Sequence, residues 1–234
     1  MIATLLLGLL LGMRHALEAD HVAAVASLVL TSKSPRHSLL HGAVWGMGHT
    51  MTLLIVGTFV ILTQSAVDPT TAAVLEGCVG IMLMLLGLDV GRRMLRERLH
   101  LHVHEHAGGV RHFHLHSHAT AATHDHQHAR AEPHSFPKRA LFVGSMHGLA
   151  GSAALILLAL GTTDSIALGL SYMALFGLGS IIGMALLSAV IAIPLNYSAN
   201  RLRRLQFGLQ CLVGLSNVGL GAYVVFVSYA AAWV

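Results

Sequence analysis

The sequence predicts an all-α membrane protein with six transmembrane helices, arranged as two inverted repeats of three helices each. Three observations support this prediction: the apolar composition, the recurrence of long apolar segments, and a match between the two halves of the chain. The 234 residues are 55% hydrophobic and 10% charged, whereas soluble domains carry about 25% charged residues. The lipid bilayer is therefore the expected surrounding, and no nucleic-acid partner is expected despite the net charge of +4.

Six apolar segments are long enough to cross a bilayer, which takes about 20 residues. They cover residues 2–30, 38–64, 72–92, 139–162, 165–194 and 205–232. The first segment is similar to the apolar core of a signal peptide. It has no basic stretch before it and continues directly into ionisable residues, so we expect it to be retained as a helix. The remaining chain leaves no room for a catalytic domain, and we expect no enzymatic activity and no catalytic residues.

Lysine and arginine are concentrated in alternate connections. Lys33 and Arg36 precede the second segment, eight basic residues lie between the third and fourth, and three lie between the fifth and sixth. The connections at Gln64–Thr71 and Gly161–Ser165 have no basic residue and one aspartate each. Because basic loops remain on the cytoplasmic side, we predict a multi-pass protein of the cytoplasmic (inner) membrane, with both termini outside.

Three short motifs recur at nearly the same offset, which indicates a repeat. The offsets are 132, 131 and 134 residues, and the motif pairs are Met13–Leu17 with Ser145–Leu149, Trp45–His49 with Phe176–Ser180, and Val79–Gly87 with Val213–Gly221. Three helices per repeat make the second half enter the membrane from the opposite side. The predicted units are residues 1–99 and 138–234, separated by a cytoplasmic loop at 100–137. Inverted repeats place a substrate site at mid-depth between the halves.

Ionisable side chains inside apolar segments point to a metal site. They are costly in a membrane and usually have a function there, and imidazole and carboxylate groups bind divalent nickel, cobalt, copper and zinc. A helical rise of about 1.5 Å per residue brings the histidines of three segments near the same depth. The predicted metal ligands are His15, Asp20, His21, His49 and His147. The alternatives are a structural Asp20–His21 hydrogen bond and core histidines at the other positions.

An unbroken first helix would present these ligands poorly. At about 100° per residue, Asp20 and His21 point roughly 140° and 240° away from His15. We therefore expect the first helix to be broken or unwound near residues 12–20, where Gly8 and Gly12 are candidate weak points.

Three more ionisable residues are predicted to lie around the site, where they either orient the ligands or form a gate. Arg14 and Glu18 are four residues apart, so they either neutralise each other or orient the ligands. His41 lies near the cytoplasmic end of the second segment. We expect it where the ion enters or leaves.

The loop between the third and fourth segments is rich in histidine. Between His100 and His134, twelve of thirty-five residues are histidine, mostly at alternate positions. Such a stretch cannot build a core and is expected to be disordered, but it can chelate divalent metals. We predict a cytoplasmic metal buffer or sensor, with a plain solvated linker as the alternative. Its candidate ligands are His102, His104, His106, His112, His114, His116, His118, His124, His126 and His128.

Two motifs in the first 60 residues resemble those of a transporter family. The run Leu11–Val25 resembles the signature of the nickel/cobalt permeases (NiCoT, within the wider NicO group), which is a histidine, four residues and then Asp-His. Met47–Thr50 resembles their second motif, Leu-Gly-His-Ser/Thr. The resemblance implies transport of Ni²⁺, with Co²⁺ as the second candidate, as cargo and with no resident cofactor. It also implies functional roles for His15, Asp20 and His21 and for His49.

The chain departs from that family in three respects. Glu18 stands where the permeases commonly have aspartate, and Met146–Gly151 stands where their later acidic and threonine-containing motifs are expected. The chain is also shorter. In these respects it is similar to a compact six-helix branch associated with urease or hydrogenase maturation. Proteins of those maturation pathways, which would receive the metal, are therefore expected partners.

Three other functions compete with uptake. A nickel/cobalt exporter of the same fold would use the same ligands, and exporters of the wider group also carry histidine-rich loops. A membrane metalloenzyme with a catalytic zinc needs a nucleophile or base, for which only Glu18 is a candidate. A carrier of thiol electrons or sulfur compounds is the third. Cys78 and Cys211 form no redox or zinc motif, and the absence of a paired cysteine site counts against thiol-electron transfer.

Overall fold

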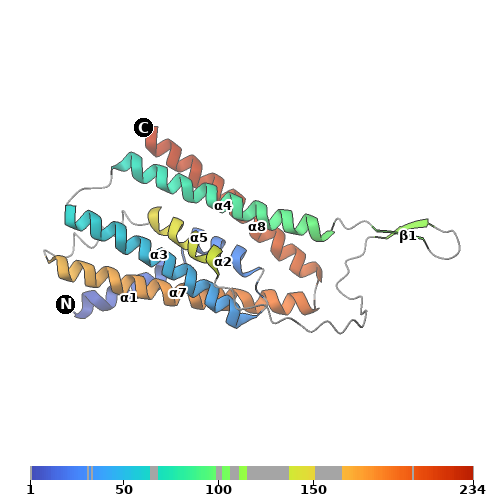
Figure 1. Cartoon of the computed structure of the whole chain (residues 1–234), viewed down its shortest axis with the longest axis horizontal. Coiled ribbons are helices and arrows are strands. Elements are labelled where there is room, and N and C mark those ends of the chain that lie inside the picture. The colour runs from blue at the N-terminus through green and yellow to red at the C-terminus, as the bar shows by residue number, and fades with distance from the viewer. Residues whose placement is uncertain are drawn as a thin grey trace.

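A computed structural model gives the structure of this chain. It describes residues 2–30, 32, 34–63, 68–98, 102–105, 111–114, 137–150, 165–201 and 203–233. Apart from one short hairpin, the secondary structure within these ranges is helical, which confirms the predicted all-α membrane fold (Figure 1). The helices are α1 (Ile2–His15), α2 (Ala19–Val29), α3 (Pro35–Thr63), α4 (Pro69–Arg98), α5 (Lys138–Ala150), α7 (Ile166–Arg201) and α8 (Arg203–Trp233).

Five of the six predicted transmembrane segments are described, the second of them as far as residue 63. Helices α3, α4, α7 and α8 are each long and apolar enough to cross a membrane, and α1 and α2, bent by 58° relative to each other, are long and apolar enough when taken as one broken span. Helix α5 begins the predicted fourth segment. The rest of that segment, from residue 151 onward, lies outside the described residues.

The predicted break in the first segment is confirmed. Helix α1 ends at His15 and α2 begins at Ala19, and two turn hydrogen bonds fill the gap. In these, Leu17 N–H donates to the Arg14 carbonyl oxygen (2.9 Å) and Glu18 N–H donates to that of His15 (3.1 Å). The break thus separates His15 from the ligands on α2 and changes the direction of the chain between them.

Gly8 and Gly12 were expected as weak points, and the structure corrects this expectation. Both glycines lie inside α1, where it packs against α7. A β-carbon on Gly8 would lie 3.0 Å from the Tyr172 ring, and one on Gly12 would collide with the Phe176 carbonyl oxygen. These positions are small because two helix backbones approach each other there.

The two halves make reciprocal contacts, as an inverted repeat requires. Helix α1 packs on α7, whereas α5 packs on α3; α3 also packs on α7, and α4 on α8. The contact of Gly12 with the Phe176 carbonyl has its counterpart in Gly144, where a β-carbon would collide with the Trp45 carbonyl. The exchange follows the sequence offsets, since Gly144 is 132 residues after Gly12 and Phe176 is 131 after Trp45.

The α4–α8 contact shows the same exchange. A β-carbon on Gly80 would lie 2.7 Å from the Gly221 carbonyl oxygen, and one on Gly87 would lie 2.6 Å from that of Gly214. Gly80 and Gly87 correspond to Gly214 and Gly221 in the sequence repeat. The repeat therefore relates the Gly80–Gly221 contact to the Gly87–Gly214 contact. Small residues at these positions let the two helices approach closely in the membrane.

Helices α4 and α8 lie together on one side of the molecule, while α1, α3 and α7 form the other side (Figure 1). Helix α2 contacts both groups. Asn217 on α8 holds α2 against α8 by hydrogen bonds. Its Nδ2 atom donates to the Ala23 carbonyl oxygen (3.0 Å) and to Ser27 Oγ (2.9 Å). This places the ligand-bearing α2 between the two groups of helices.

The histidine-rich loop contains a short antiparallel hairpin, formed by β1 (His102–Glu105) and β2 (Arg111–His114). His102 pairs with His114, and His104 with His112. These strands differ from the expected absence of regular structure, and their alternating histidines have the period of two residues that is typical of a strand. The predicted buffer ligands His106, His116, His118, His124, His126 and His128 lie outside the described residues.

Candidate metal site

Four histidines that are far apart in the sequence meet inside the helical bundle. His15 ends α1, His21 lies in the first turn of α2, His49 is in the middle of α3, and His147 is near the end of α5. Their exposed fractions are 9%, 1%, 0% and 2% in that order. The structure therefore brings together the three imidazoles that the sequence placed near one depth and His15, which was expected within reach of them, and it buries all four.

Three of these imidazoles form a compact group of ligand atoms. His15, His21 and His49 each offer a ring nitrogen, and these nitrogens all lie within 4.8 Å of one another. The Nε2 atoms of His15 and His21, and both ring nitrogens of His49, have no hydrogen-bond partner within the described residues. Buried polar atoms are normally paired, so these nitrogens are suited to a ligand. An ion with bonds of about 2.1 Å needs nitrogens about 3 to 3.5 Å apart, so a small inward shift would complete such a site.

Carboxylates hold two of the rings by their other nitrogen. His15 Nδ1 lies 2.9 Å from Glu18 Oε1, and His21 Nδ1 lies 3.0 Å from Asp20 Oδ1. The backbone N–H of His21 also donates to Asp20 Oδ1, over 2.9 Å. Carboxylates commonly orient metal-binding histidines in this way and leave Nε2 as the ligand atom. Asp20, expected as a ligand, thus occupies an orienting position beside the three-histidine group.

His147 joins the site from the second half of the chain. Its Nε2 atom lies 2.8 Å from Asp20 Oδ2, and its ring centroid lies 4.2 Å from that of His21. Asp20, His21 and His147 form a second group whose ligand atoms are within 4.8 Å of one another. The Asp20 carboxylate therefore bridges an imidazole of each half.

Two aromatic residues form walls of the site that we did not predict. The Trp45 ring lies 5.4 Å from the His21 ring and 5.7 Å from the His147 ring, and the Phe176 ring lies 5.3 Å from that of His15. Trp45 and Phe176 are buried and begin equivalent motifs of the sequence repeat. That equivalence is the signal that could have identified them.

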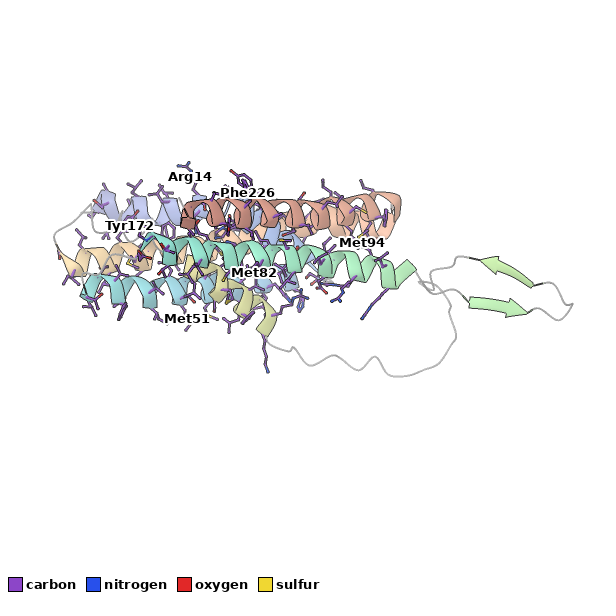
Figure 2. All side chains as sticks on the ribbon, turned by 90° about the horizontal axis from the view of Figure 1, so that it is seen from above. Arg14, Met51, Met82, Met94, Tyr172 and Phe226 are labelled. Carbon is purple, nitrogen blue, oxygen red and sulfur yellow. The ribbon has the colours of Figure 1, made fainter. Side chains whose placement is uncertain are left out.

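Of the three residues predicted around the site, Glu18 alone contacts one of the four histidines among the contacts of the described residues. Arg14 is exposed and points away from the bundle (Figure 2). Glu18, whose side chain is 57% exposed, pairs with His15, so the alternative of a simple Arg14–Glu18 pair is not what the structure describes. His41 lies eight residues before His49 on α3. Its Nδ1 atom is 2.9 Å from the carbonyl oxygen of His37.

The two cysteines of the chain are not near each other. Cys78 is on α4 and Cys211 is on α8, and both are free thiols. Gly80 packs against Gly221 on the antiparallel helix α8, so Cys78 lies at about the level of residue 223. That level is about twelve residues along α8 from Cys211. Twelve residues of helix span about 18 Å, whereas a disulfide needs Cα atoms within about 7 Å. The pair cannot form a disulfide within this arrangement.

Together, the fold and this cluster define a multi-span membrane protein with a buried group of imidazoles where its two halves meet. The chain belongs to the family described as the transmembrane region of cytochrome c biogenesis protein, whose sequence profile matches residues 3–223. It is also 37% identical over 205 residues to the urease accessory protein UreH of Bacillus sp. (strain TB-90). That match covers 87% of this chain and 82% of the relative. No solved structure matches.

These matches support a membrane family similar to metal transporters. Membership of the nickel/cobalt permease family itself stays a prediction.

Proposed function

We propose that this protein takes up Ni²⁺ across the cytoplasmic membrane, with Co²⁺ as the second candidate substrate. The observation that carries the proposal is the group formed by His15, His21 and His49, whose unpartnered ring nitrogens converge in the bundle. Imidazole nitrogen suits nickel and cobalt better than it suits the harder ions magnesium and calcium. The similarity to a urease accessory protein supports the same assignment, because it connects the chain to the assembly of a metalloenzyme.

The carboxylates contribute to binding through the imidazoles they contact. Asp20 and Glu18 accept hydrogen bonds from Nδ1–H of His21 and His15, which fixes these rings with Nε2 toward the ion. Their negative charge also offsets the charge of the ion at a depth where water is scarce. The ion binds after losing most of its water, since the surrounding side chains are buried.

Movement of the two halves gives the ion access to the site. The imidazoles are buried, so a change in the packing of the helices has to open the site to each side in turn. Inverted repeats commonly do this by rocking one half against the other around a fixed site. The contact between His147 and Asp20 joins the two halves at this point. During the transition, this contact either breaks or keeps the two residues together as they move. In the predicted orientation, the histidine-rich loop then receives the ion in the cytoplasm and passes it to urease or hydrogenase maturation proteins.

An exporter remains the alternative within the same fold. Export would use the same imidazoles and the same movement, and only the direction of net flux distinguishes the two. A second candidate, thiol-electron transfer, is favoured by the name of the matching family. The separation of Cys78 and Cys211 argues against it, because one chain then lacks a cysteine couple.

Flux through the purified protein tests the proposal. Protein in liposomes that contain a nickel-sensitive dye is exposed to external Ni²⁺, and His49→Ala is compared with Met51→Ala, an exposed residue of the same helix outside the cluster. We expect nickel flux with the intact chain and with Met51→Ala, and no flux with His49→Ala. Equal flux in all three proteins would contradict the site, and no nickel or cobalt flux in any of them would contradict the function. The sign of the nickel change in cells then separates uptake from export.

A further inference from the structure

Helices α4 and α8 diverge beyond their last close contact and leave a cavity between them. The two helices touch at Gly87 and Gly214. One turn further along α4, a β-carbon on Gly91 would have no atom within 4 Å. The space between the diverging ends has a volume of about 590 Å³, which is within the range of small-molecule sites. None of the residues that line the cavity belongs to the histidine cluster.

The cavity is apolar along its walls and basic at one place. Both helices contribute apolar side chains, among them Leu95 and Met94 on α4 and Leu215 on α8, and the polar side chains that line it are Arg92 and Gln210. Figure 2 shows Met94 near the end of α4. Leu95 and Leu215 are 60% and 73% exposed, so the cavity is flanked by the surface that faces the membrane.

Arg92 differs from the arginine beside it. Arg93 forms an ion pair with Asp89, and Asp89 also binds Arg139 at 2.6 Å. Arg92 is exposed and makes no ion pair or hydrogen bond with the residues that the structure describes. Its guanidinium group is therefore available to an anion, and guanidinium groups bind phosphate oxygens with strong, charge-assisted hydrogen bonds.

The position of the cavity in the helical bundle indicates which kind of ligand it binds. In the most apolar stretch of α8, 17% of the residues are buried inside the protein, compared with 56% in α3. The groove is therefore open to lipid, and the arginines at 92, 93, 96 and 98 mark the membrane interface. We propose that this cavity binds an anionic phospholipid. One acyl chain fills the groove between α4 and α8, and the phosphate contacts Arg92 and Gln210. Basic pockets between transmembrane helices are known to bind such headgroups.

A second copy of the chain is a less suitable occupant. Contact between two copies through this groove would bring the arginine-rich end of α4 in one copy near that of the other. Like charges oppose each other at an interface, whereas a lipid phosphate neutralises Arg92. The charge at the cavity thus favours a lipid over a dimer.

Lipid retention by the intact chain tests whether the charge of Arg92 selects an anionic lipid. The protein is purified in detergent, incubated with equal amounts of phosphatidylglycerol and phosphatidylcholine, and the bound lipids are counted by mass spectrometry. We expect Arg92→Gln to lower the ratio of bound phosphatidylglycerol to phosphatidylcholine by about fivefold, the effect of one basic residue near an anionic lipid. Arg96→Gln removes the same charge from the same helix end without lining the cavity, and should leave the ratio unchanged. An unchanged ratio in Arg92→Gln would overturn the proposal.

A second pair of variants tests the cavity itself. Gly91→Phe fills the groove, and open space around Gly91 allows the larger side chain. Gly208→Phe is the control, since Gly208 also has open space and does not line the cavity. We expect Gly91→Phe to lose the retained lipid and Gly208→Phe to keep it. Equal retention would overturn the proposal. So would an intermolecular cross-link through Cys211, in a Cys78→Ser background in lipid bilayers, because it would show a second copy over the groove.

Discussion

The Oδ2 atom of Asp20 lies 2.8 Å from Nε2 of His147, so a carboxylate of the first half holds an imidazole of the second. The other oxygen of the same carboxylate lies 3.0 Å from His21 Nδ1. One side chain thereby links the candidate metal ligands to the contact between the two halves. A transporter whose halves move around a fixed site would need such a connection where binding and movement meet.

Replacement of Asp20 tests this connection. Asp20→Asn keeps the size of the side chain but removes its charge, so two imidazoles lose their carboxylate partner. Loss of such a partner typically weakens metal affinity by about 10 to 100-fold, and we expect a decrease of this size in nickel binding by calorimetry. Glu18→Gln should have a smaller effect, because Glu18 is more exposed and contacts one ring. Equal affinities in Asp20→Asn and the intact chain would show that the carboxylate does not orient the ligands.

The repeat makes a prediction about stability at Gly144. A β-carbon there would collide with the Trp45 carbonyl oxygen, and excess volume in a packed core costs about 1–3 kcal/mol. Gly144→Ala should therefore lower the thermal unfolding temperature in detergent, and Gly12→Ala, its counterpart, should do the same. Gly91→Ala is the control. It meets no neighbouring atom and should keep or raise the unfolding temperature. If the Gly144 and Gly91 variants melt alike, the close packing of α5 on α3 is wrong.

The hydrogen bonds from Asn217 to α2 are predicted to stabilise the fold. Its amide donates to the Ala23 carbonyl oxygen and to Ser27 Oγ, and hydrogen bonds between membrane helices average about 0.6 kcal/mol each. Asn217→Ala should lower the free energy of unfolding by about 1 kcal/mol, measured by denaturation in mixed micelles. Ser216→Ala changes the exposed neighbour on the same helix and should have no effect. A loss of stability from both changes would mean that α8 is sensitive for another reason.

The histidine-rich loop is expected to affect metal handling without being part of the pathway. Deletion of residues 100–134 removes twelve histidines but leaves the four buried imidazoles in place. We expect the deleted protein to transport nickel in liposomes at a rate similar to that of the intact chain, while its total nickel binding falls. Complete loss of flux, with the protein still folded by size-exclusion chromatography, would place the loop in the transport path.

Much of the fold could be predicted because the membrane constrains it. Apolar length identified the spans that the structure describes, and three motif matches at nearly one offset predicted an inverted repeat, with which the exchanged contacts at Gly12 and Gly144 agree. The break after His15 followed from helical geometry, since His15 and His21 cannot face one point on a straight helix. The role of Gly8 and Gly12 was misjudged, because the sequence does not show which helix will approach a small residue.

The candidate site was predictable as a set of residues but not as a set of contacts. Similar depths of His21, His49 and His147, with His15 within reach, indicated that these histidines would meet. Depth does not determine which nitrogen faces which carboxylate, and the pairs His15–Glu18 and Asp20–His147 depend on how the helices are rotated and docked. The aromatic walls at Trp45 and Phe176 were missed for a related reason, since aromatic residues in a membrane helix are most often ordinary packing residues.

Nickel accumulation in cells is the most direct test of passage of the ion through the buried imidazoles. Cells that express the intact chain are compared with cells that express His21→Ala or Met51→Ala at matched membrane levels, and total nickel is measured by mass spectrometry. We expect high nickel with the intact chain and with Met51→Ala, whose side chain is exposed on α3, and background nickel with His21→Ala. Lower nickel with the intact chain than in cells without it would show export through the same site. Equal nickel in the intact and His21→Ala cells would contradict passage of the ion through the buried imidazoles.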